Sequence, residues 1–216
     1  DRFECNVAQD LFVLWNMESP VNMRATLDAS YMRQFDLLMN YRRDAAIYTP
    51  YVDFEAKLIA PLPANSTALW HARKQSGVLL ATAVSNCNDF AGRSFLVSAL
   101  SARLHSRFIN IGKCHRTARL PDGASLEGLA SRAFFYLAIE NSNCEDYVTE
   151  KLRRALAIGS VPVVFAPPQS VAGGAGDETP VPDYASMLPP HTFINIADHE
   201  SIDALIAHLE RVAADR

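Results

Sequence analysis

The sequence predicts an α/β fold built on a parallel sheet. Two stretches of the chain each have the order strand, polar loop, helix and strand. Helices are indicated by apolar residues at helical spacing, and strands by short apolar runs between turn-forming residues. Of the 216 residues, 49% are hydrophobic and 20% are charged, which is enough to bury a core. Strands that alternate with crossover helices form a parallel sheet with helices on its faces.

The first unit extends from residue 78 to residue 111. Residues 78–84 are an apolar run that predicts a strand, and residues 85–91 form a polar loop. A helix over residues 92–104 and a strand over residues 108–111 follow. The polar loop therefore connects a strand directly to a helix.

The second unit has a strand at residues 134–139 and a loop of small polar residues at 140–146. A helix follows, because apolar residues recur at helical spacing on one face. These residues are Val148, Leu152, Ala155 and Leu156. Asp146 is placed to cap this helix and Gly159 to end it. The next strand covers residues 161–165 and has a proline near its start.

The C-terminal part predicts one more strand and helix. A strand at residues 193–196 leads into a helix with Ser201 as its candidate N-cap. The inward-facing residues of this helix are Ile202, Leu205, Ile206, Leu209 and Val212. Residues 169–182 are rich in Gly and Pro, which predicts a flexible loop to which no chemistry is assigned.

The N-terminal third predicts strands at residues 11–15 and 35–39, and a linker at residues 61–64. A domain boundary near residue 70 follows. A segment of this size is small for an independent domain, so we expect the rest of an N-terminal domain upstream. The expected division is the end of that incomplete domain at residues 1–70 and a Rossmann-like domain at residues 71–216.

Composition and missing motifs exclude several classes of function. The net charge of -4, with both signs interspersed, provides no basic face for nucleic acid. The longest apolar run, residues 155–168, is too short to span a bilayer, and Gly and Pro interrupt it. The chain contains no Gly-x-Ser-x-Gly, Walker or Gly-x-Gly-x-x-Gly motif, so serine hydrolases, P-loop enzymes and dinucleotide oxidoreductases are not supported.

Four cysteines leave two alternatives open. Cys5, Cys87, Cys114 and Cys144 fit either two disulfides or four separate buried thiols, and none has zinc-ligand spacing. A glycosylation sequon begins at Asn65, and it matters only if the chain enters the secretory pathway.

The loop and helix start at residues 140–151 bring amides, a tyrosine, carboxylates and a lysine to the carboxyl edge of the sheet. Free N–H groups at a helix start attract phosphate, and Lys151 would add a full charge in the second turn. A nucleotide diphosphate is the ligand that this pattern favours. The alternative is a solvated helix surface formed by Glu150 and Lys151, preceded by an Asx turn.

Arg93 has the matching position at the helix start of the first unit. Two cations from two such units could bind one diphosphate from both sides and take the place of a metal ion. The sequence has no Asp-x-Asp pair and no His/Asp cluster of ligand spacing, so we expect neither a metal site nor a cofactor. Taken alone, an arginine such as Arg93 is more often a surface residue.

Glu18 follows an apolar strand and precedes a proline turn. Its carboxylate is expected to project from the sheet edge, where it could act as a general base. The alternative is a solvated surface charge, which is the commoner role of a loop glutamate.

Several motifs together resemble one known family. The run FYLAIENSNCEDYVTEKLRRALAIGSVPVVFAPP, at residues 135–168, closely resembles the signature of the α-1,3-fucosyltransferases. The resemblance extends over nearly the whole chain. Its other motifs are Trp15–Pro20, Tyr41–Asp44, Thr49–Tyr51, Ala83–Cys87 with Arg93, Gly112–Arg116, and residues 183–194 from Asp-Tyr to Pro-Pro-His-Thr-Phe-Ile.

The resemblance implies an inverting glycosyltransferase of the two-domain GT-B fold that uses GDP-fucose as its donor and needs no metal for catalysis. It implies that Glu18 deprotonates the acceptor hydroxyl, while Arg93 and Lys151 hold the donor diphosphate. Asn141, Tyr147 and Glu150 are implied to contact the donor as well.

Within the family, the motifs look most like the plant-type enzymes that transfer fucose in α-1,3 linkage to GlcNAc of N-glycans on glycoproteins. The resemblance also implies a Golgi lumenal location, with membrane attachment only through an N-terminal anchor outside this sequence. Transfer to a protein serine or threonine, transfer to an outer N-acetyllactosamine, and nucleotide-sugar binding without catalysis remain as alternatives.

Overall fold

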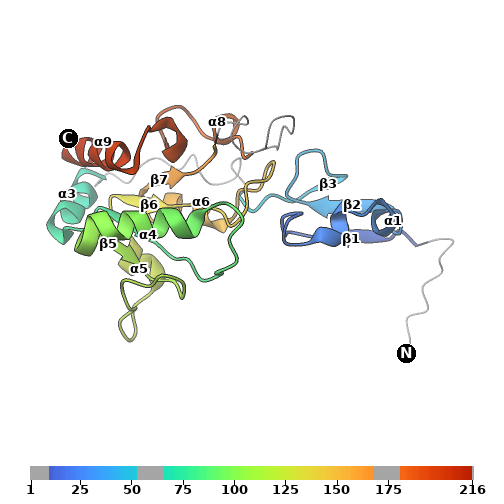
Figure 1. The fold of residues 1–216 in the computed structure, drawn as a ribbon, viewed down its shortest axis with the longest axis horizontal. Helices are drawn as coiled ribbons and strands as arrows, with labels where there is room; N and C mark the ends of the chain where they lie inside the picture. The colour runs from blue at the N-terminus through green and yellow to red at the C-terminus, as the bar shows by residue number, and fades with distance from the viewer. Residues whose placement is uncertain (1–9, 53–65, 168–180, 216) are drawn as a thin grey trace.

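The computed structural model describes residues 10–52, 66–167 and 181–215, and these residues contain two parallel sheets. Figure 1 shows the sheets in two separate parts of the molecule, with the second and larger one covered by helices. The linker expected at residues 61–64 and most of the loop expected at residues 169–182 lie outside the described residues.

The first sheet has three strands in the order β1-β2-β3. The strands are β1 (Val13–Trp15), β2 (Leu37–Asn40) and β3 (Ile47–Tyr48), all parallel. A 3-10 helix, η1 (Arg24–Leu27), and a short helix, α1 (Ala29–Met32), connect β1 to β2. The two strands predicted here are confirmed, with β2 beginning two residues later than expected. Because the strands are parallel, their carboxyl ends lie at one edge of the sheet.

The second sheet has five parallel strands in the order β5-β4-β6-β7-β8. The strands are β4 (Leu80–Thr82), β5 (Phe108–Asn110), β6 (Phe135–Leu137), β7 (Val161–Val164) and β8 (Ile194–Asn195). Each lies within the corresponding predicted strand and is shorter than it. The α/β fold with a parallel sheet is therefore confirmed.

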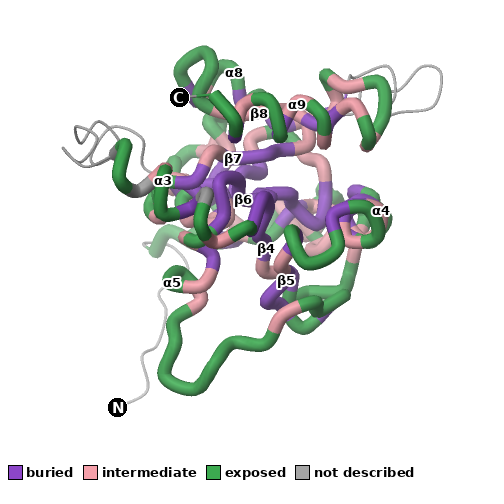
Figure 2. Tube along the Cα trace, turned by 90° about the vertical axis from the view of Figure 1, so that its left-hand side faces the viewer, coloured by how far each residue is buried: buried purple, intermediate pink, exposed green. Residues whose placement is uncertain are grey.

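Helices cover both faces of the second sheet. They are α3 (Ser66–Ser76), α4 (Arg93–Leu104), η2 (His105–Arg107), α5 (Leu126–Ala130), α6 (Glu150–Ala157), α8 (Tyr184–Met187), η3 (Ile196–Asp198) and α9 (Ile202–Ala214). Alternate residues of a strand point to opposite faces. Leu80 and Phe135 accordingly pack in the same cluster as α4 and α9, whereas Ala81 and Tyr136 pack in the cluster of α5, α6 and α8. Figure 2 shows the resulting arrangement, with buried strands between helices whose outer surfaces are exposed.

The helix ends were predicted with one error. Ser201 caps α9 by accepting a hydrogen bond from the Ala204 amide, and Gly159 ends α6 with a positive φ of 67°, so both predictions are confirmed. Asp146 does not cap α6, which begins four residues later at Glu150. Asp146 has a left-handed φ of 56°, and its carboxylate instead accepts a hydrogen bond from the Arg43 amide.

No helix in the described part of the chain is long and apolar enough to cross a membrane. The proposed division into residues 1–70 and 71–216 stays a prediction. The described residues place the first sheet before residue 53 and the second sheet after residue 65.

Arg73 joins α3 to the ends of two other helices. Its guanidinium donates hydrogen bonds to the backbone carbonyl oxygens of Ser131, after α5, and of Ile158 and Gly159, after α6. The side chain is buried, and the carboxyl ends of helices carry carbonyl groups without intrahelical partners. Arg73 therefore provides hydrogen-bond donors to the backbone carbonyl groups where α3 meets the ends of α5 and α6.

We expect Arg73→Met to lower the free energy of unfolding by about 2–4 kcal/mol, because it leaves buried carbonyl groups without donors. Chemical denaturation monitored by circular dichroism measures this loss. Arg73→Lys is the control, since one ammonium cannot reproduce the planar set of donors, and it should recover only part of the loss. A Met variant as stable as the wild type would contradict this role.

Candidate functional site

The candidate site lies where the loops after β4 and β6 meet. The sheet order reverses at β4, since β5 lies on one side of it and β6 on the other. Parallel α/β sheets bind ligands beyond the carboxyl ends of their strands at such a point. A hydrogen bond of 2.7 Å from the Phe90 amide to the Asn141 carbonyl oxygen joins the two loops there. Each loop leads into a helix, α4 or α6.

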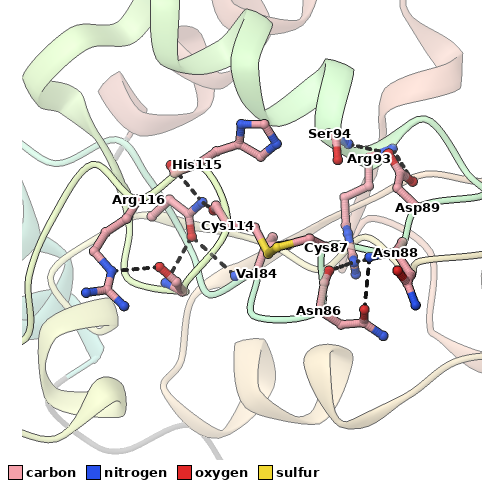
Figure 3. The surroundings of a disulfide bond; sticks show 12 residues. Val84, Asn86, Cys87, Asn88, Asp89, Arg93, Ser94, Cys114, His115 and Arg116 are labelled. Carbon is pink, nitrogen blue, oxygen red and sulfur yellow. Dashed lines mark hydrogen bonds between the residues drawn. A yellow bond between two sulfur atoms is a disulfide. The ribbon is translucent and has the colours of Figure 1, made fainter.

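A disulfide between Cys87 and Cys114 attaches the first of these loops to the loop after β5 (Figure 3). The Asn110 side chain fixes this second loop, because it donates to the Cys114 carbonyl oxygen and accepts from the Gly112 amide. A Cβ atom at Gly112 would lie 2.0 Å from the Val84 carbonyl oxygen, so only glycine fits. The close approach of the two backbones therefore explains the glycine of the Gly-Lys-Cys motif.

The cysteines match neither of the alternatives left open by the sequence. Cys87 and Cys114 form one disulfide, while Cys144 is a free, partly buried thiol. Cys5 and Asn65 of the sequon lie outside the described residues.

Asp89 caps the start of α4. Its carboxylate accepts hydrogen bonds from the amides of Ala91 (3.1 Å), Arg93 (2.9 Å) and Ser94 (2.7 Å). Gly92 has the N-cap position but no side chain to serve there. Burial raises the pKa of Asp89, but the amide donors outweigh burial and hold the pKa below its usual value.

Arg93 is buried against the first loop and is only 2% exposed. Figure 3 shows its side chain directed toward the loop backbone, where it donates to the carbonyl oxygens of Asn86 and Asn88. Burial lowers the pKa of Arg93, and the charges of Asp89 and Glu140 oppose this effect. The structure therefore confirms that Arg93 begins α4. Because Arg93 is buried, the alternative of a surface residue is wrong.

Residues 140–149, which we call loop 140–149, connect β6 to α6. Glu140 is buried at its start, and Lys151 reaches back from α6 to the Glu140 carboxylate with an N–O distance of 2.9 Å. Glu150 lies beside Lys151 at 3.4 Å. Burial raises the pKa of Glu150, but the nearby charge of Lys151 is the main cause that lowers it below its usual value. Glu150 is consequently ionised at neutral pH.

Three polar side-chain atoms in this region of the described chain are buried without hydrogen-bond partners. They are Nε of Arg93, Oδ1 of Asn141 and Oδ1 of Asn143. Buried polar groups are nearly always paired, because an unpaired one costs about 1–3 kcal/mol. In the described part of the chain, these atoms therefore keep hydrogen-bonding capacity that no other residue uses.

The loop after β1 brings Glu18 from the first sheet to the same place. The Tyr147 hydroxyl donates to Glu18 Oε2 at 3.4 Å, and the Asn22 amide donates to the same oxygen at 3.3 Å. Tyr147 packs against Tyr41 and Tyr51, with ring centroids 5.1 and 6.2 Å away. Glu18 is exposed, so its carboxylate faces solvent beside this aromatic cluster.

The tyrosine hydroxyls beside Glu18 are neutral. Burial and then the Glu18 charge raise the pKa of Tyr51 to about 12, and the same two causes raise the pKa of Tyr147 further. Both tyrosines therefore keep their protons at physiological pH. Tyr147 can act as a hydrogen-bond donor to the Glu18 carboxylate.

Other contacts between the two sheets were not predicted as part of the site. The Ser142 hydroxyl donates to the Ser19 hydroxyl at 2.7 Å, in a buried position. Ion pairs also join Arg42 to Glu145 and Arg43 to Asp146. The only indication of these contacts in the sequence was that the segments on both sides belong to motifs that resemble the α-1,3-fucosyltransferases.

The structure thus brings the predicted site residues together. Arg93, Asn141 and Lys151 lie where the two loops meet, and Tyr147 links them to Glu18. The roles assigned to these residues stay predictions. Glu140, Thr149 and Asp89 are additional polar residues of the site that the sequence analysis did not single out.

Two family models match this chain. One, described as the N-terminal part of fucosyltransferases, matches residues 6–52. The other, described as the C-terminal part of glycosyltransferase family 10 (fucosyltransferase), matches residues 71–216.

Named relatives are similar over most of this chain. The human 4-galactosyl-N-acetylglucosaminide 3-alpha-L-fucosyltransferase FUT5 is 36% identical over 207 residues, which are 94% of this chain and 48% of that protein. The alpha-(1,3)-fucosyltransferase C of Drosophila melanogaster is 30% identical, and the match covers 95% of this chain and 48% of that protein. The chain spans about half the length of these relatives.

One solved structure shares the fold. It is an alpha1,3-fucosyltransferase crystallised with GDP-fucose, with a TM-score of 0.62 and 17% identity. The match covers 96% of this chain and 64% of that one. This likeness confirms the GT-B fold expected from the sequence.

We expect the stabilising effect of Asp89 to depend on pH. Its pKa is lowered in the folded state, so its contribution is fully present above the unfolded value of about 3.9 and disappears as the pH falls through the lower folded value. Asp89→Asn should therefore be less stable than the wild type from pH 5 to 7, by about 0.3–1 kcal/mol, because the amide lacks the negative charge at the helix start.

Urea denaturation of the wild type and Asp89→Asn between pH 7 and pH 3 measures this difference. The two unfolding free energies should begin to converge below about pH 4, the unfolded pKa, and should continue to converge as the pH falls through the lower folded pKa of Asp89. A difference that stays constant over the whole range would contradict the capping role of the Asp89 charge.

Proposed function

Because this chain belongs to glycosyltransferase family 10, the fucosyltransferases, we propose that it binds GDP-fucose and takes part in inverting transfer of fucose. The observation that carries this proposal is the arrangement of charges. Arg93 and Lys151 lie at the switch point of the second sheet, and Glu18 comes from the first sheet to the same junction. The proposed enzyme is an α-1,3-fucosyltransferase.

The donor diphosphate is proposed to bind between the two loops of the second sheet. The N-terminal end of α6 offers free backbone amides, and Lys151 in its first turn adds a positive charge. Arg93 supplies a second cation from the start of α4, and Asn141 lies next to it with an unpartnered carbonyl group. These cations would stabilise the charge that develops on the departing GDP.

Glu18 is proposed to be the general base. Inversion requires a base on the side of the sugar opposite the leaving group, so that it can take a proton from the attacking hydroxyl. Glu18 approaches from the other sheet and is exposed, so an acceptor can reach it. Tyr147 and Glu150 are proposed to contact the donor, and the Tyr147 hydroxyl also orients Glu18.

The acceptor is proposed to be GlcNAc of a glycoprotein glycan, with α-1,3 linkage. The motifs resembling the plant-type enzymes favour an N-glycan core, whereas the names of the FUT5 enzymes favour a GlcNAc that carries galactose. Acceptor screening with core N-glycans and N-acetyllactosamine would distinguish the two. Donor binding without turnover on either would indicate a non-catalytic binding protein.

A Golgi lumenal location is proposed for this protein, as a type II membrane protein. The disulfide between Cys87 and Cys114 supports an oxidising compartment, where such bonds form and persist.

Donor binding is tested by calorimetric titration with GDP-fucose in the presence of EDTA. We expect saturable binding by the wild type and a loss of at least about tenfold in affinity for Lys151→Met, which removes a charged hydrogen-bond donor. UDP-GlcNAc is the control ligand and should not bind. No binding of GDP-fucose by the folded chain would contradict the proposed function.

The base is tested with Glu18→Gln in the full-length protein. We expect turnover to fall about 100- to 10,000-fold, because the amide cannot accept the acceptor proton. The dissociation constant for GDP-fucose should change little. Asp28→Asn, which alters an exposed carboxylate at the start of α1, is the control and should keep its activity, because asparagine also caps a helix. Equal losses of donor binding and turnover in Glu18→Gln would argue against the base assignment.

A further inference from the structure

Glu140 is a buried carboxylate to which the proposed mechanism gives no role. It lies at the start of loop 140–149, three residues after β6, and is 2% exposed. Burying a carboxylate is costly unless it is paired and hydrogen-bonded. An apolar residue at this position would avoid that cost, so the contacts of Glu140 indicate what the carboxylate does.

The contacts of Glu140 all lead to the start of α6. One oxygen accepts from the Thr149 amide at 2.8 Å, and both accept from the Thr149 hydroxyl at 2.9 Å. The second oxygen also accepts from Lys151 Nζ at 2.9 Å. Lys151 Nζ donates in turn to the Thr149 hydroxyl at 2.7 Å. Glu140, Thr149 and Lys151 thus form a closed group of hydrogen bonds.

This group leaves one donor of Lys151 available. An ammonium has three N–H donors, and two of them are directed to Glu140 and Thr149. The third is directed toward Glu150 at 3.4 Å, a weak contact with a side chain that is 44% exposed. The Lys151 side chain is 18% exposed, so the protein does not cover it completely.

Thr149 supports a role for this group beyond helix stability. Thr149 has the N-cap position of α6, where a threonine hydroxyl commonly accepts a hydrogen bond from the helix backbone. Here the hydroxyl makes no such bond and is committed to Glu140 and Lys151 instead. The Thr149 hydroxyl therefore holds the lysine and does not cap the helix.

We propose that Glu140 is a positioning residue, which together with Thr149 holds the Lys151 ammonium ready to bind the donor diphosphate. This inference rests on the proposed function, in which Lys151 contacts the diphosphate. A free lysine side chain samples many rotamers, and these must be restricted when it binds a phosphate. Glu140 restricts them before the ligand arrives, so binding loses less conformational freedom.

The test compares GDP with guanosine, which lacks the phosphates. Glu140→Gln keeps the shape of the side chain but loses its charge and one acceptor oxygen. We expect its affinity for GDP, measured by calorimetry, to fall about tenfold, and its affinity for guanosine to stay within about twofold, because the effect acts through the lysine. Equal losses for both ligands would show a merely structural role and overturn the inference.

A second comparison, made in the Lys151→Met variant, tests directly whether the effect of Glu140 acts through Lys151. In Lys151→Met, adding Glu140→Gln should change the affinity for GDP by less than about twofold, since the residue through which Glu140 acts is absent. A tenfold loss in this background would overturn the inference. If Glu140→Gln does not fold, Thr149→Val replaces it in both comparisons, because it removes the bridging hydroxyl and leaves the carboxylate in place.

Glu210→Gln is the matched control. It makes the same carboxylate-to-amide change in α9, outside both loops of the site, where Glu210 pairs with Arg107 at 2.6 Å, and it should keep both affinities. A wild-type chain that binds no GDP contradicts the proposed function and this inference together. Wild-type binding that Glu140→Gln leaves unchanged or strengthens contradicts the inference alone.

Discussion

The contact between loop 140–149 and the first sheet is the constraint on which the proposed site depends. The loop follows β6 at the switch point of the second sheet, so its start is fixed by the sheet. Its other side is fixed by the buried hydrogen bond between Ser142 and Ser19, and by the packing of Tyr147 beside Glu18. Parallel strands make this possible, because the carboxyl ends of each sheet lie at one edge. A donor site on one sheet and a base on the other can therefore lie at one junction.

Much of the fold could be predicted from the sequence, because local patterns determine it. The strand at residues 135–137 is buried on both faces, and its continuous apolar run is typical of a central parallel strand. Gly159 and Ser201 have local conformational reasons to end and begin helices, and both act as predicted. The motifs around Arg93 and Lys151 identified the two loops that meet at the switch point, since each follows a strand and opens a helix.

The rest depends on partners that are distant in the chain. Asp146 looked like a helix cap, but its carboxylate binds the Arg43 amide, 103 residues away, and that contact determines its conformation. Cys87 pairs with Cys114, and no spacing pattern could select this pair over the others. Glu140 looked like one of several polar loop residues, and only the structure shows that it is buried and bound to Thr149 and Lys151. Such tertiary contacts override local preferences, and a single sequence contains no direct signal for them.

The location of the donor is the most direct test of this account. A crystal structure of the protein with GDP-fucose would show the diphosphate relative to the three charged residues. We predict that the diphosphate contacts Lys151 and Arg93 at the meeting of the two loops, and that Glu18 lies on the opposite side of the fucose. A diphosphate bound away from both cations would contradict the account. So would a fucose whose face opposite the diphosphate cannot be reached by Glu18.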